Sequence, residues 1–233
     1  MRRLWVAVPV ALLASFVCGA AAAQDERDPI EGFNRAIFAF NEGLDSVLIR
    51  PVAKGYEAVL PGPVRAGISN FYGNFADPFI AVNNLLQGKP ADAVGDVARF
   101  IFNSSFGILG IFDVASEMGL EKHEEDFGQT FGRWGAGPGP YLMLPVFGPR
   151  DVRDAGGLVL DLYADPVGNV DHVPTRNSLT AVRLVNDRAI LLPADQIIEA
   201  AALDKYAYIR DAYLQRRRSL VFDGRPPREP EWD

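Results

Sequence analysis

The sequence predicts an all-α, mostly helical protein built from short amphipathic helices. Apolar residues recur at spacings of three and four in several stretches, which is the period of one helix face. Proline and glycine separate these stretches, as they commonly do at helix ends. The long departure from this pattern lies between Phe127 and Arg150, where glycine and proline are frequent enough to predict an irregular loop or a small hairpin.

The first predicted helix runs from residue 28 to residue 50. Asp28 can accept hydrogen bonds from the free amides of a helix start, and Pro29 suits the first turn. We expect Pro51 to end this helix, because proline cannot donate a backbone hydrogen bond. Core packing and contact with lipid are both compatible with its apolar face, which comprises Ile30, Phe33, Ile37, Phe40, Leu44 and Val47.

Further helices follow the same pattern. Pro78 and Pro193 are expected to interrupt or end helices, and Gly88 to cap one. Their approximate ranges are 63–78, 79–86, 90–101, 151–163, 178–192, 193–203 and 204–220. In the helix that begins at residue 90, we expect the apolar side chains to point inward, namely Val94, Val97 and Ile101.

Residues 100–112 read FIFNSSFGILGIF and carry no charge over thirteen positions. This length is too short to cross a bilayer but can lie within one leaflet. A buried core helix is the alternative, although Gly107 and Gly110 weaken a regular helix. A buried Asn103 would need a hydrogen-bond partner.

The N-terminal residues 1–23 are typical of a secretory signal peptide, with Arg2 and Arg3 before a short apolar run. Cleavage after Ala23 would make Gln24 the first residue and change the net charge from −7 to −9. Lipidation at Cys18 is the rival prediction, and the residues before that cysteine fit it poorly. We expect residues 24–222 to form one domain and residues 223–233 to be a disordered tail.

Composition and motifs weaken the case for several classes of function. The acidic net charge argues against general nucleic-acid binding. After cleavage the chain would hold no cysteine, and therefore no disulfide, thiol nucleophile or cysteine-bound metal. His123 stands beside acidic residues that are adjacent rather than spaced to converge, so we expect no metal site and no cofactor. The sequence carries no hydrolase or metalloprotease motif, and we expect no enzyme activity.

A series of short motifs runs in order through residues 28–222. Each is weak alone, but their order and spacing together are highly specific. They are DPIEGFNR from Asp28, FxFN from Phe38, RPVA from Arg50, SNFxGN from Ser69, NxLLQG from Asn83, FDVA from Phe112, FGxT from Phe127, GxGPY from Gly137 and RDxGG from Arg153. With these motifs the chain resembles the MlaA/VacJ family.

The resemblance implies a mostly helical, ring-shaped domain at the periplasmic face of a Gram-negative outer membrane. Such proteins sit in the inner leaflet beside a trimeric porin. They admit misplaced phospholipid from the outer leaflet through an amphipathic central channel and pass it to a periplasmic lipid-carrier protein, without chemistry on the lipid. Many members are lipoproteins, and the surroundings of Cys18 depart from that pattern.

Physical reasoning and the resemblance together predict two sets of site residues, with core packing as the alternative for each. The channel wall and gate are predicted at Gly128, Trp134, Gly137, Gly139, Pro140, Tyr141, Leu142 and Met143. Contact with the leaflet is predicted for Phe33, Phe40, Phe100, Phe102, Ile108, Leu109 and Phe112. A structural envelope protein that binds a porin without carrying lipid, and a phospholipase-like enzyme, are the competing hypotheses.

Overall fold

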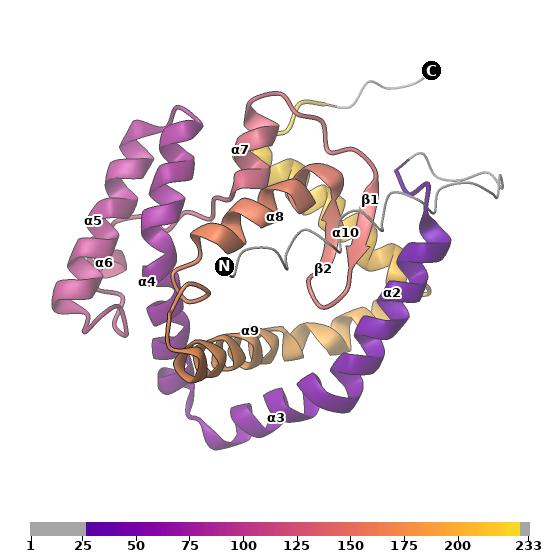
Figure 1. Cartoon of the computed structure of the whole chain (residues 1–233), viewed down its shortest axis with the longest axis horizontal. Helices are drawn as coiled ribbons and strands as arrows, with labels where there is room; N and C mark the ends of the chain where they lie inside the picture. Colours follow the sequence, from indigo (N-terminus) through magenta and orange to yellow (C-terminus); the bar gives the residue numbers. More distant parts are fainter. Residues whose placement is uncertain (1–26, 229–233) are drawn as a thin grey trace, which may run out of the picture.

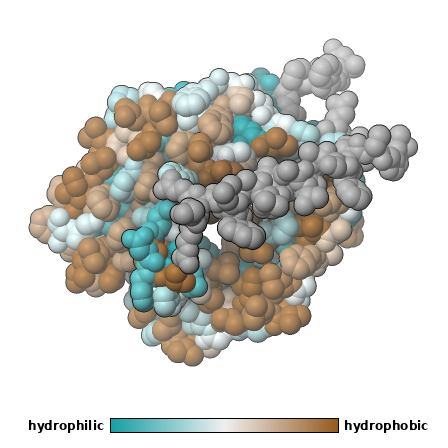
Figure 2. Space-filling model, in the orientation of Figure 1, coloured by the Kyte–Doolittle hydropathy of each residue, from teal (hydrophilic) through white to brown (hydrophobic). Residues whose placement is uncertain are grey.

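In the computed structural model, which describes residues 27–228, helices are arranged around a central opening (Figure 1). The space-filling view shows the surface hollowed near the same place (Figure 2). The elements are α2 (Glu31–Leu44), the π-helical turn η2 (Asp45–Ile49), α3 (Arg50–Val59), α4 (Gly62–Leu86), α5 (Pro90–Phe106), α6 (Val114–Glu117), α7 (Phe127–Arg133), β1 (Tyr141–Leu144), β2 (Gly148–Asp151), α8 (Val152–Ala164), α9 (Val173–Ala201) and α10 (Lys205–Val221). The expected mostly helical fold with a small hairpin is confirmed.

The ring is closed by neighbouring pairs of helices. Helices α4 and α5 pack side by side at one edge, α3 packs along α9, and α7 packs on α8 (Figure 1). Helix α10 contacts α7 and β2, which brings the end of the described chain back to the hairpin. The hairpin therefore lies between α2 and α10, close to the central opening (Figure 1).

The first helix is longer than predicted. Helix α2, η2 and α3 follow one another without a break, so Pro51 does not end the helix. The π-helical turn directly before this proline widens the backbone, and the helix bends and continues. Asp28 is not the helix cap either, since Ile30 occupies that position. The Asp28 carboxylate is buried and accepts hydrogen bonds from Asn34 Nδ2 and from the Tyr206 hydroxyl.

Two further prolines lie inside helices that the sequence analysis divided. Pro78 is within α4 and Pro193 is within α9. Each helix packs against three other helices of the ring, and this packing outweighs the loss of one backbone hydrogen bond. The prediction that Gly88 caps a helix agrees with the structure, because Gly88 has φ +79° and its amide donates to the Leu85 carbonyl.

A small hairpin is present in the Gly/Pro-rich stretch, as predicted. Strands β1 and β2 are antiparallel, with Tyr141 opposite Asp151 and Leu144 opposite Gly148. The segment before them is more regular than predicted, because Phe127–Arg133 forms α7. The Asp126 side chain caps this helix by accepting from the Gln129 amide.

The contacts between the helices are unusually polar. Fully buried polar and charged side chains connect α4, α5 and α7, and others lie on α2 and α9. They include Asn34, Asn74, Asp77, Asn83, Asn84, Asp96, Arg99, Asn103, Thr130 and Asn186. Large apolar side chains cover much of the outside instead, visible as brown areas in Figure 2.

Helix α5 shows this inversion most clearly. Its buried positions are Ala93, Asp96, Arg99 and Asn103. Val94, Val97 and Ile101 are exposed, so the expectation that they point inward is wrong. The helical period was predicted correctly, but the apolar stripe faces outward. None of the helices within residues 27–228 is long and apolar enough to cross a membrane.

Candidate functional site

A cavity of about 300 Å³ lies on the inner side of the ring, between α2, η2, the hairpin, α9 and α10. Its walls are mostly apolar and include Phe38, Met143, Val146, Leu184, Leu191 and Ile209. Charged and amide side chains occupy part of the wall, namely Asn41, Glu42, Asp45, Asp187 and Arg188. A cavity of this kind has the small size and mixed lining of a site for an amphipathic small molecule.

The charged part of the wall is held by two arginines. Arg188 Nε lies 2.6 Å from Asp45 Oδ1, and its Nη2 lies 2.7 Å from Asp195 Oδ2. Arg50 Nε lies 3.0 Å from Asp45 Oδ2. Burial opposes ionisation of Asp45, but the hydrogen bonds from Arg188 and Arg50 outweigh it and hold its pKa below the usual value. The π-helical turn is therefore tied to α9 by an ionised carboxylate.

The hairpin forms another part of the cavity wall and is attached to α2 by side chains. Met143, Val146, Gly148 and Pro149 face the cavity. Asn41 holds the turn, because its Nδ2 donates to the Leu144 carbonyl and its Oδ1 accepts from the Val146 amide.

The structure divides the predicted channel residues among three environments. Met143 is buried and reaches the central cavity. Trp134, Gly137 and Gly139 line a separate groove of about 380 Å³ beside Val152. The Trp134 indole Nε1 donates to the Leu86 carbonyl at 2.9 Å. These residues do not form one continuous wall.

The other predicted channel residues lie in the hairpin or in the core. Tyr141 is 0% exposed and packs edge-on against Tyr206 and Tyr213. Burial raises its pKa. In this structure Tyr141 is a core side chain, as the core-packing alternative expects. Leu142 is half-buried on the neighbouring strand position, and Pro140 is exposed just before the strand.

Gly128 is a packing residue of α7. It is buried, and a Cβ atom at this position would lie 2.4 Å from Asp154 Oδ1 and 2.8 Å from Arg217 Nη2. The lack of a side chain lets α7 approach α8 and α10 closely. This explains why a glycine-rich segment is helical here, and it places Gly128 away from the residues that line the central cavity.

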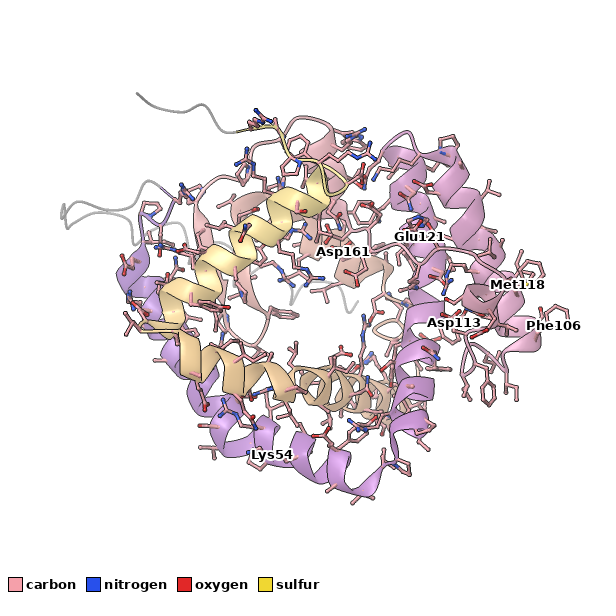
Figure 3. All side chains as sticks on the ribbon, turned by 180° about the vertical axis from the view of Figure 1, so that it is seen from behind. Lys54, Phe106, Asp113, Met118, Glu121 and Asp161 are labelled. Carbon is pink, nitrogen blue, oxygen red and sulfur yellow. The ribbon has the colours of Figure 1, made fainter. Side chains whose placement is uncertain are left out.

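The predicted leaflet-contact residues are mostly exposed. Phe33, Phe40, Ile108, Leu109 and Phe112 are exposed, whereas Phe100 and Phe102 are half-buried. Phe106 and Met118, which were not predicted, project outward at the edge formed by α5 and α6, whereas Asp161 lies beside the central opening (Figure 3). The leaflet-contact role itself remains a prediction.

The loop after α5 exposes its apolar side chains at the cost of backbone strain. Ile108 and Leu109 have φ values of +53° and +55°, which are rare for residues other than glycine. The Gly110 amide donates to the Asn103 carbonyl at 2.9 Å and holds the turn. A side chain with a strained backbone that still points to solvent is a candidate for contact with another surface.

A network of buried polar side chains holds this loop in place. Arg99 donates to both carboxylate oxygens of Asp113, each at 2.9 Å. Asn103 donates to Asp113 Oδ1 and accepts from the Ala115 amide, which supplies the partners expected for a buried asparagine. Burial opposes ionisation of Asp113, but hydrogen bonds from Ser116, Asn103 and Arg99 prevail and lower its pKa to about 2.

Ion pairs tie the acidic segment 117–126 to the helices around it. Glu125 pairs with Lys89, and Asp126 accepts two hydrogen bonds from Arg217. His123 Nδ1 lies 2.8 Å from Asp96 Oδ1, and the described residues contain no group of three potential metal ligands. Sequence reasoning missed Asp45, Arg188 and the other α9 residues of the cavity, because they come together only through the ring. The signal peptide, Cys18, Ala23 and Gln24 lie outside the described residues.

Comparison with known proteins gives a consistent result. The MlaA lipoprotein family matches residues 26–220. The intermembrane phospholipid transport system lipoprotein MlaA of Escherichia coli strain K12 is 35% identical over 228 residues, which cover 96% of this chain and 90% of that protein. The protein of the same name from Haemophilus influenzae is 31% identical over 206 residues, covering 86% of this chain and 82% of that protein.

An uncharacterized protein of Rickettsia bellii is 40% identical over 195 residues, covering 83% of this chain and 76% of that protein. Among solved structures, one described as "Structural basis for maintenance of bacterial outer membrane lipid asymmetry" matches with a TM-score of 0.73 and 36% identity. That match covers 83% of this chain and 98% of the other chain.

Proposed function

The chain belongs to the MlaA family, and on that premise we propose that it transports phospholipid at a Gram-negative outer membrane. The observation that carries this proposal is the inverted polarity of the ring. Large apolar side chains face outward, polar side chains fill the contacts between helices, and a partly apolar cavity lies inside. An apolar exterior suits the acyl region of a leaflet, and the cavity suits a lipid in transit.

The finer parts of the proposal come from the family resemblance. The ring would sit in the inner leaflet at the periplasmic face, beside a trimeric porin. It would admit misplaced phospholipid from the outer leaflet and deliver it to a periplasmic lipid-carrier protein. The lipid would pass without a change in its covalent bonds.

The geometry offers a physical route for such passage. Irregular backbone is tolerated at membrane depth where it is packed in protein or lines a water-filled cavity, and the hairpin turn meets this condition beside the central cavity. Leu184 and Leu191 present apolar surface to acyl chains on the α9 side. The paired charges of Asp45 and Arg188 lie on the same wall, where a polar headgroup can be accommodated.

A pair of variants on α9 tests the proposal. Leu184→Asp puts a carboxylate into the cavity wall, whereas Thr180→Asp puts one on an exposed position of the same helix that does not line the cavity. We expect phospholipid to accumulate at the surface of cells that carry Leu184→Asp, and not in cells that carry Thr180→Asp. Clearance at the wild-type rate by a folded Leu184→Asp protein in the membrane fraction would contradict the proposal.

Two further measurements separate the competing functions. Mass spectrometry of gently extracted wild-type protein should find bound phospholipid, and its absence would favour a structural porin-binding protein. Incubation with phospholipid should release neither fatty acid nor lysolipid. Release of either product would favour an enzyme.

A further inference from the structure

Helix α2 presents two asparagines to the same edge of the hairpin. Asn34 and Asn41 are seven residues apart, which places them on one helix face, two turns from each other. Asn34 donates to the Tyr141 carbonyl at 3.1 Å and accepts from the Met143 amide at 2.9 Å. Its neighbour on that face makes the same pair of bonds further along the hairpin.

Asn41 Nδ2 donates to the Leu144 carbonyl at 3.0 Å, and Asn41 Oδ1 accepts from the Val146 amide at 2.8 Å. One edge of β1 pairs with β2, and Asn34 satisfies backbone groups of Tyr141 and Met143 on the other edge, as an additional strand would. Asn41 instead holds the last residue of β1 and the turn that follows it.

The two attachments differ in their access to water. Asn34 is 0% exposed, both of its bonds to the hairpin are buried, and its Nδ2 also donates to Asp28 Oδ1 at 2.7 Å. The bond from the Val146 amide to Asn41 lies at the exposed surface. Water competes readily for an exposed hydrogen bond and poorly for a buried one, so the attachment near the turn opens more easily.

The turn itself is strained. Val146 has φ +69°, a left-handed conformation that is rare for a β-branched residue, and its side chain is exposed. Its amide hydrogen bond to Asn41 is one of the contacts that hold this conformation. Val146, Gly148 and Pro149 line the central cavity, and the turn projects toward the central opening (Figure 1).

We propose that Asn41 is a positioning residue whose releasable hydrogen bonds set where the hairpin turn stands at the mouth of the central cavity. Asn34 is the fixed attachment about which the turn moves. When the Asn41 bonds open, the strained turn relaxes away from the cavity and the passage widens. The link to lipid passage rests on the proposed function, whereas the control of the turn by Asn41 does not.

Hydrogen–deuterium exchange tests the attachment without any lipid. Asn41→Leu keeps a similar side-chain volume and removes both hydrogen bonds to the hairpin. We expect the amides of Val146 and Phe147 to exchange at least about tenfold faster, while the amides of residues 141–143 keep their protection. Unchanged exchange at Val146 would overturn the proposal.

Asn70→Leu is the matched control. Asn70 is also a helical asparagine that donates to a loop carbonyl at the surface, that of Ile111. This variant should leave hairpin exchange unchanged. If it loosens the turn as much as Asn41→Leu does, the effect is a general loss of stability and the proposal is wrong.

Lipid clearance from the cell surface then tests the consequence for passage. Asn41→Leu should pass phospholipid several-fold faster than the wild type. A short bismaleimide bridge between Asn41→Cys and Val146→Cys should slow passage several-fold relative to the same double variant without the bridge. Equal rates in all of these proteins would overturn the role of the turn.

The two proposals fail in different ways. A wild type that clears no phospholipid would overturn the proposed function, and the exchange measurements would still support control of the turn by Asn41. If the wild type clears phospholipid and neither change at Asn41 alters the rate, only the role of the turn in lipid passage is overturned.

Discussion

Two apolar side chains on the outer face of α5 provide a direct test of whether this face contacts a membrane. Val94 and Ile101 are 70% and 53% exposed and lie on one helix face. Complete burial of a large aliphatic side chain is worth about 1.5–3 kcal/mol. Burying the exposed parts of these two in a leaflet should therefore contribute about 2–3.5 kcal/mol, which corresponds to a roughly 30- to 300-fold effect on membrane partitioning.

Val94→Asn combined with Ile101→Asn removes this contribution while keeping both positions uncharged. Because the two side chains face away from the protein interior and asparagine has about the helix propensity of valine and isoleucine, the free energy of unfolding should change by at most about 1 kcal/mol. The assay is co-flotation of a chain beginning at Gln24 with phospholipid vesicles over a range of lipid concentrations. The partition coefficient should fall by the factor given above.

Two controls on the same helix make the result specific. Ser105→Asn changes an exposed polar residue and should leave partitioning unchanged. Asn103→Leu should act on stability instead, because it leaves the buried Ala115 amide without its acceptor, at a cost of about 1–3 kcal/mol. Unchanged partitioning of the folded double variant would refute the assignment of this face to the leaflet.

Two further predictions concern α8. Gly157→Ala should destabilise the protein by about 1–3 kcal/mol, because its Cβ would lie 2.3 Å from the Gly128 backbone nitrogen. The exposed Gly156→Ala should instead stabilise α8 by about 0.5–1 kcal/mol. Thermal denaturation compares the two variants, and equal effects would contradict the packing argument. Burial raises the pKa of Asp161 to about 6, so its contribution to stability is present below about pH 4 and is lost as the pH rises through 6. Asp161→Asn, which can still accept from the Phe127 amide, should therefore raise the free energy of unfolding at about pH 7.5 by about 1–2 kcal/mol and leave it unchanged near pH 4 in denaturant titrations. An equal effect at both pH values would show that the carboxylate charge is not responsible.

Local sequence signals predicted the kinds of elements but not all of their ends. The period of three to four residues and the Gly/Pro-rich stretch were sufficient for a mostly helical protein with a small hairpin. The helix ends predicted at Pro51, Pro78 and Pro193 were wrong. A π-helical turn before Pro51, and packing of α4 and α9 against neighbouring helices, let the helices continue through proline. These effects depend on tertiary contacts that a local window does not contain.

The candidate site was harder to predict because its residues meet across the ring. Asp45 and Arg188 form one ion pair although 143 positions separate them. Tyr141 and Met143 belong to the same apolar strand, and a sequence does not reveal that one enters the core while the other also reaches the cavity. The outward apolar face of α5 was not predicted for another reason. The rule that apolar side chains point inward assumes that water surrounds the protein.

The polar interior and the apolar exterior have a common physical cause if the ring works in a leaflet. Acyl chains are as apolar as leucine, so burying leucine between helices gains little there, and hydrogen bonds and close packing must hold the helices together. Buried asparagines meet this need. Asn83 Oδ1 accepts from the Thr130 hydroxyl of α7, and Asn103 joins α5 to the Asp113 turn. Asparagines are poor core residues for a protein surrounded by water, but in a leaflet they would hold these helices together.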